Sequence, residues 1–119
     1  MVRDDRFQLA FYRQRSGREP VKEWLSQLPS GDRRTVAEDI KILQKGWPVG
    51  MPLARKVDRD LWELRSKLDK RIGRILFTVQ EQAIVLLHAF IKKKRRAPLR
   101  ELETARQRLH QVKQGWYEA

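Results

Sequence analysis

The sequence contains no cysteine, which excludes a disulfide framework and a zinc site built on thiolates. Imidazole is also scarce, because only His88 and His110 are present and they fall in separate predicted elements. No apolar run approaches the roughly 20 residues that a membrane-spanning helix needs. The first residues, 1–6, have no apolar segment of the signal-peptide type. We therefore expect a cytoplasmic protein with no membrane-spanning segment, no metal site and no cofactor.

Acidic residues are few relative to basic ones. The chain has 15 Asp and Glu against 27 Lys and Arg, a formal net charge of +12. Such an excess favours a polyanionic partner through counterion release and electrostatic steering, although it does not identify the polyanion. An anionic membrane, an acidic protein and a surface that is basic merely for solubility remain alternatives. A length of 119 residues suits one compact domain.

Three successive segments, residues 61–66, 72–79 and 84–92, show the alternation of strands. The short connections at 68–70 and 80–82 predict hairpins, and therefore antiparallel neighbours. The alternation places an apolar set on one face, namely Trp62, Leu64, Ile75, Phe77, Val79, Val85, Leu87, Ala89 and Ile91. The other face receives Glu63, Arg65, Arg74, Thr78, His88 and Lys92. A sheet with one apolar and one cationic face is a candidate phosphate-binding surface.

The rest of the chain supplies helices and shorter strands. Apolar residues at spacing two predict a strand over 7–13, and spacings of three and four predict helices after Pro20 and after Ser30. A short edge strand over 53–57 and a final amphipathic helix over 99–112 complete the pattern. The order is strand, two helices, three or four strands, helix. This predicts an α+β fold in which helices pack on one face of a small antiparallel sheet.

An ordered series of motifs runs through these elements. It comprises Phe-Tyr-Arg at 11–13, Gly-Arg-Glu-Pro-Val at 17–21, Gly-Trp-Pro-Val-Gly-Met-Pro at 46–52, Leu-Trp-Glu-Leu-Arg at 61–65, Arg-Ile-Leu-Phe at 74–77 and His-Ala-Phe-Ile-Lys-Lys at 88–93. Over about residues 6–112 the series resembles the RelE/ParE toxin superfamily, and within it the phage-derived HigB-like toxins.

The resemblance implies a single RelE-like domain over residues 1–119. It also implies the toxin of a type II toxin–antitoxin system, which cleaves mRNA on the ribosome without a metal and so inhibits translation. The antitoxin would be encoded nearby and would usually contain a helix-turn-helix domain. Tyr117 lies beyond the last helix, so the role of the C-terminal tyrosine in RelE is not transferred to it.

By position, the resemblance assigns Arg65, Arg74, Lys92 and Lys93 to the catalytic site. Metal-independent RNA cleavage uses the ribose 2′-hydroxyl as nucleophile, so the protein must neutralise phosphate charge and move two protons. Arginine suits the phosphate because it donates two parallel hydrogen bonds and keeps its charge. Lysine can move a proton if nearby cations lower its pKa, and His88 is an alternative proton carrier.

Further residues are candidates for RNA binding. Arg55 and Lys56 are expected to position the sugar–phosphate backbone of the RNA, and Tyr12 is expected to border the catalytic site. The basic run continues through Lys94, Arg95 and Arg96, and such runs commonly bind phosphates or only water.

Less specific interpretations also fit the pattern. Arg65 could simply pair with Glu63, two residues away on the same face, and His88 could be a half-buried structural histidine. At the level of function, a ParE-like inhibitor of DNA gyrase would share the fold without being a nuclease. A non-catalytic nucleic-acid-binding module would need only the charge.

Overall fold

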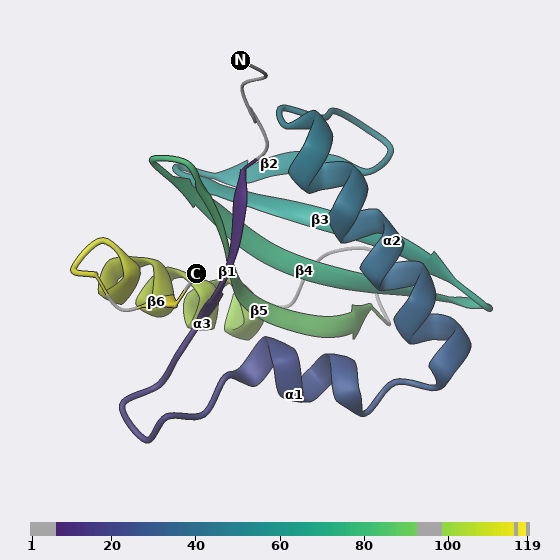
Figure 1. The fold of residues 1–119 in the computed structure, drawn as a ribbon, viewed down its shortest axis with the longest axis horizontal. Helices are drawn as coiled ribbons and strands as arrows, with labels where there is room; N and C mark the ends of the chain where they lie inside the picture. The colour runs from purple at the N-terminus through teal and green to yellow at the C-terminus, as the bar shows by residue number, and fades with distance from the viewer. Residues whose placement is uncertain (1–6, 93–98, 116, 119) are drawn as a thin grey trace, which may run out of the picture.

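The computed structural model describes residues 7–92, 99–115 and 117–118 (Figure 1). The elements in chain order are β1 (Gln8–Tyr12), α1 (Pro20–Ser26), α2 (Ser30–Gly46), β2 (Ala54–Asp58), β3 (Leu61–Leu68), β4 (Arg71–Gln80), β5 (Ala83–Lys92), α3 (Leu99–Val112) and β6 (Tyr117–Glu118). This order confirms the predicted α+β class and is compatible with a RelE-like fold. The optional extra strand of the prediction is β2, whereas the two-residue β6 has no counterpart there.

The strands form one sheet in the order β2-β3-β4-β5-β1-β6. Strands β2 to β5 are an antiparallel meander, and the predicted hairpins at 68–70 and 80–82 are confirmed. Strand β1 pairs in parallel with β5, with Gln8 opposite Ala83. The sheet is therefore mixed, and the expectation of a wholly antiparallel sheet is wrong at β1. Periodicity identifies a strand but leaves the direction of its pairing open.

Helices cover both faces of the sheet. Helices α1 and α2 pack on one face, and α2 crosses the near side of β3 and β4 in Figure 1. Helix α3 packs on the opposite face, against apolar side chains from the core of the sheet; this second cluster includes Leu61, Leu76, Val85, Leu87, Ala105, Leu109 and Val112. The expectation that all helices share one face holds for α1 and α2 but is wrong for α3. The apolar residues on the second face explain this, because they need a cover of their own.

A β-bulge in β5 changes which side chains share a face. Leu76 lies opposite His88, but the next residue of β4, Phe77, lies opposite Leu86. Leu87 is thus the extra residue, and the alternation of β5 shifts by one at this point. As a result, Val85 and Leu87 belong to the core under α3 and Ile84 and Leu86 to the core under α1 and α2. The prediction that Val85 and Leu87 lie with Phe77 is wrong for this reason.

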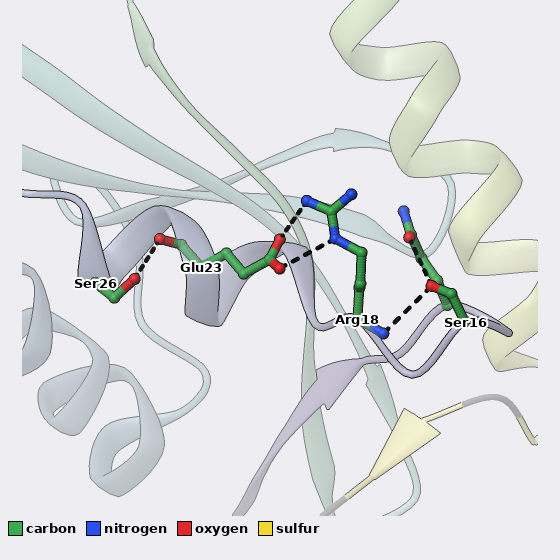
Figure 2. Close-up of polar contacts among 5 residues, drawn as sticks. Ser16, Arg18, Glu23 and Ser26 are labelled. Atoms are coloured by element: carbon green, nitrogen blue, oxygen red, sulfur yellow. Dashed lines mark hydrogen bonds and ion pairs between the residues drawn. The ribbon is translucent and has the colours of Figure 1, made fainter.

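The loop that leads from β1 into α1 is held by polar contacts (Figure 2). Arg18 donates from Nε and Nη2 to the two carboxylate oxygens of Glu23, at 3.1 and 2.9 Å. The hydroxyl of Ser26 donates to the carbonyl oxygen of Glu23 at 2.7 Å. The ion pair is exposed, so it contributes little stability. It fixes the entry into α1, whose Val21 is buried in the core.

Candidate functional site

Four cationic side chains converge on the face of the sheet that α3 partly covers. Arg65 and Arg74 lie directly opposite each other on β3 and β4, and Arg55 of β2 lies opposite Glu63 of β3. Lys92 of β5 lies opposite Ile72, two residues from Arg74. Directly paired residues point to the same side of a sheet. The predicted cationic face therefore exists, and four neighbouring strands build it.

Glu63 is the anion of this cluster. Arg74 donates from Nη1 to Glu63 Oε2 at 2.8 Å, and Arg55 donates from Nε to Oε1 at 3.2 Å. The side chains of Arg74 and Glu63 are 1% and 0% exposed, whereas that of Arg55 is 42% exposed. Burial lowers the pKa of Arg74, and Glu63 opposes this change. The carboxylate thus pairs with Arg74 and Arg55, and not with Arg65 as one interpretation of the sequence had it.

Arg65 and Lys92 remain without a carboxylate partner within the described residues. Arg65 is half-buried, and its buried Nε has no hydrogen-bond partner there; the same holds for Nε of Arg74. Partial burial lowers the pKa of Lys92, and Arg74 and Arg65 lower it further by charge repulsion. The unsatisfied guanidinium donors suit the binding of an oxyanion. The neighbouring lysine, whose pKa is lowered, suits the transfer of a proton at the same site.

His88 lies on the same face but is held by α3. Its Nε2 lies 2.9 Å from Glu101 Oε2, and its Nδ1 lies 3.2 Å from Arg108 Nη1. Because a guanidinium only donates, Nδ1 accepts and Nε2 carries the proton that is donated to Glu101. Burial lowers the pKa of His88, and Arg108 adds to this while Glu101 opposes it. Both ring nitrogens are occupied, so the geometry favours a structural histidine that also stacks on Phe90.

Residues 23–110 match the family of phage-derived, Gp49-like proteins. The chain belongs to this family. It is a RelE-like toxin family associated with toxin–antitoxin systems, which implies an antitoxin partner in general. No curated protein matches the chain at a significant level.

The Gp49-like match includes β2 to β5, and with them the whole cationic cluster, but leaves out β1. This bears on Tyr12, which lies on β1. Tyr12 is buried in the core under α3, its hydroxyl donates to Gln111, and the guanidinium carbon of Arg108 lies 5.2 Å from its ring centroid. The structure thus places Tyr12 away from the cationic cluster that it was expected to border.

The remaining candidates divide between two positions. Lys56 lies on the opposite face of β2 from Arg55, with its Nζ 5.8 Å from the ring centroid of Trp62, so it does not join the cluster. Lys93, Lys94, Arg95 and Arg96 lie outside the described residues. Among the residues that are described, no group of three His, Asp or Glu could hold a metal. No helix in the described residues is long and apolar enough to span a membrane.

The predicted site residues do not include three residues that make polar contacts with Arg74 or His88, namely Glu63, Glu101 and Arg108. Glu63 was expected to matter only as a partner of Arg65, because its cross-strand neighbours were unknown. Glu101 and Arg108 lie within the predicted helix over 99–112, and one feature of the sequence points to them. They are seven residues apart, two helical turns, and so share a side of α3. Each also directly precedes an apolar residue, Leu102 or Leu109, that packs on the sheet.

Proposed function

We propose that the chain is a toxin of the HigB-like branch, a single RelE-like domain that cleaves mRNA on the ribosome without a metal. One observation carries the proposal: Arg55, Arg65, Arg74 and Lys92 come from four adjacent strands to one patch of the sheet. Membership in a family of toxins turns this patch from a generic anion site into a candidate nuclease site. The net charge of +12 supports RNA and the ribosome as partners.

The cleavage itself would be a transesterification. The ribose 2′-oxygen attacks the adjacent phosphorus, the bond from phosphorus to the 5′-oxygen breaks, and a 2′,3′-cyclic phosphate and a 5′-hydroxyl result. Arg65, with Arg74 beside it, stabilises the negative charge that builds on the phosphate oxygens. Lys92 in its neutral form accepts the proton of the 2′-hydroxyl and then donates it to the departing 5′-oxygen, because its lowered pKa brings it closer to neutral pH than an ordinary lysine. His88 orients α3 in this scheme and does not move protons.

The antitoxin is proposed to be a helix-turn-helix protein encoded beside the toxin. Its physical requirement is negative charge or steric bulk over the cationic cluster, because the strongly basic toxin repels any partner of its own sign. Purification of the toxin together with the product of the neighbouring reading frame tests this directly. Failure of the two proteins to form a complex contradicts it.

The nuclease proposal is tested by inducing the chain in growing cells and mapping the 5′ ends of translated transcripts. We expect new ends within coding regions, and we expect Lys92→Ala to reduce them. Lys41→Ala, on the exposed side of α2, is the matched control and should behave like the unchanged chain. Intact messages under growth arrest contradict the proposal. Intact messages together with DNA damage favour gyrase inhibition, and no growth arrest favours a plain nucleic-acid-binding module.

A further inference from the structure

Glu63 is a fully buried carboxylate that the cleavage scheme does not use. It lies on β3 at the centre of the cationic cluster, and each of its oxygens accepts a hydrogen bond from a different arginine. Burying a carboxylate and a guanidinium has a large desolvation penalty. The attraction between the two charges often does no more than cancel this penalty. Two apolar residues of similar volume would commonly give a fold at least as stable. Stability alone therefore does not explain why this pair is here.

The arrangement of charges suggests what the pair does. Arg65 and Arg74 face each other directly across β3 and β4, and like charges in that position repel. Glu63 engages Arg74 and Arg55 but not Arg65. One negative charge among four positive ones leaves the cluster strongly cationic. Glu63 thus offsets part of the repulsion between Arg65 and Arg74. It does so without pairing with Arg65, which remains able to bind an anion.

We propose that Glu63 is a positioning residue for the phosphate site. It fixes the guanidinium groups of Arg74 and Arg55, and it leaves Arg65 and Lys92 to receive the phosphate. The buried, unpartnered Nε of Arg65 supports this division, because such a donor requires an acceptor that the described residues do not supply. Nε of Arg74 is unpartnered as well, but Nη1 of Arg74 is held by Glu63. The inference rests on the proposed function insofar as the phosphate is that of RNA.

Two substitutions separate the length of the side chain from its charge. Glu63→Asp keeps the charge but is one methylene shorter, so its carboxylate is drawn back from both arginines. Glu63→Gln keeps the length and one acceptor oxygen but removes the charge. Glu38→Gln, on the exposed side of α2, is the control. Urea denaturation of each variant gives the fraction folded, by which all rates are divided.

The first measurement is mRNA cleavage on translating ribosomes. We expect Glu63→Asp to lower kcat per folded molecule by about 100-fold, the scale of a misplacement near 1 Å. We expect Glu63→Gln to move the pH profile toward lower pH, because Arg55, Arg65 and Arg74 would then act on Lys92 without an opposing charge. Both variants matching the unchanged chain in kcat, KM and pH profile per folded molecule would overturn the proposal.

The second measurement needs no nuclease activity. Inorganic phosphate should raise the melting temperature of the unchanged chain and of Glu38→Gln, and this increase should be lost in Glu63→Asp and in Arg65→Ala. Full retention in Glu63→Asp overturns the positioning role, even if the chain proves to cleave no RNA. Loss of cleavage with this phosphate pattern intact overturns only the proposed function.

A third variant covers the case in which the single substitutions do not fold. The double substitution Glu63→Gln with Arg74→Gln replaces the buried ion pair by two neutral amides of similar size. If the pair serves only folding, this variant should bind phosphate and cleave RNA like the unchanged chain, which would overturn the proposal. We expect it to fold and to lose the phosphate-induced increase in melting temperature.

Discussion

Substitutions of the two facing arginines, Arg65 and Arg74, should affect folding and catalysis differently. Arg74→Ala leaves Glu63 buried, with only the half-exposed Arg55 as its partner. Removing one member of a buried ion pair typically destabilises a protein by about 3–5 kcal/mol. An unfolding entropy of about 2.1 cal/mol/K per residue gives about 0.25 kcal/mol/K for 119 residues. We therefore expect the melting temperature of Arg74→Ala to fall by about 12–20 °C.

Arg65→Ala should have the opposite profile. Arg65 has no carboxylate partner among the described residues and faces another arginine. Its removal relieves a repulsion, so the free energy of unfolding should stay within about 0.5 kcal/mol of that of the unchanged chain. Cleavage should nevertheless fall by about 10²–10³-fold, the usual effect of losing one donor to a transition-state oxyanion.

The assay combines thermal unfolding followed by circular dichroism with cleavage on ribosomes at a temperature where both variants are folded. Arg34→Ala, on the exposed side of α2, serves as the control for the loss of an arginine. Equal losses of melting temperature in Arg65→Ala and Arg74→Ala would refute the division of roles around Glu63. So would an Arg65→Ala variant that cleaves at the unchanged rate.

Three further predictions follow from the same geometry. The pKa of His88 is lowered in the fold, so the unfolded chain binds that proton more readily. Its contribution to stability should therefore fall as pH drops below about 6.5, and urea denaturation should show this pH dependence weakened in His88→Gln. Lys92→Gln should reduce the salt dependence of binding to a single-stranded oligoribonucleotide by about one unit of slope, as fluorescence anisotropy at several salt concentrations would show; an unchanged slope would remove Lys92 from the phosphate site. Phe77→Ala should destabilise the core by about 3–5 kcal/mol in urea denaturation, and a loss under 1 kcal/mol would mean that the site collapses around the missing ring.

The sequence predicted most of the central sheet because its signals there are local. Alternation through β3 and β4 is regular, and the faces of Trp62, Leu64, Ile75 and Phe77 follow from it without error. The same alternation placed Arg65 and Arg74 on one face, because neither β3 nor β4 contains a bulge where the two strands pair. The convergence of cations could therefore be inferred from the sequence.

The pairing inside that cluster could not be inferred in the same way. Which arginine reaches Glu63 depends on the register of β2, β3 and β4, and register is a relation between strands that no single strand encodes. Arg74 has no carboxylate on its own strand, and its partner Glu63 comes from β3. The position of α3 is a similar case. Its amphipathic pattern shows that one side is buried, but it does not say against which face of the sheet.

The bulge at Leu87, which makes the predicted faces of Val85 and Leu87 wrong, also bears on the proposed function. Before the bulge, Ile84 and Leu86 enter the core under α1 and α2 while Val85 enters the core under α3, so this half of β5 is buried on both sides. Unbroken alternation from Ile84 and Leu86 would carry Lys92 to the face of α1 and α2, away from Arg65 and Arg74. The extra residue reverses the alternation, so that Lys92 lies on the cationic face. Bulges are common beside active sites because they re-aim side chains in this manner. A single irregularity thus lets one strand contribute to two cores and still place a lysine at the proposed phosphate site.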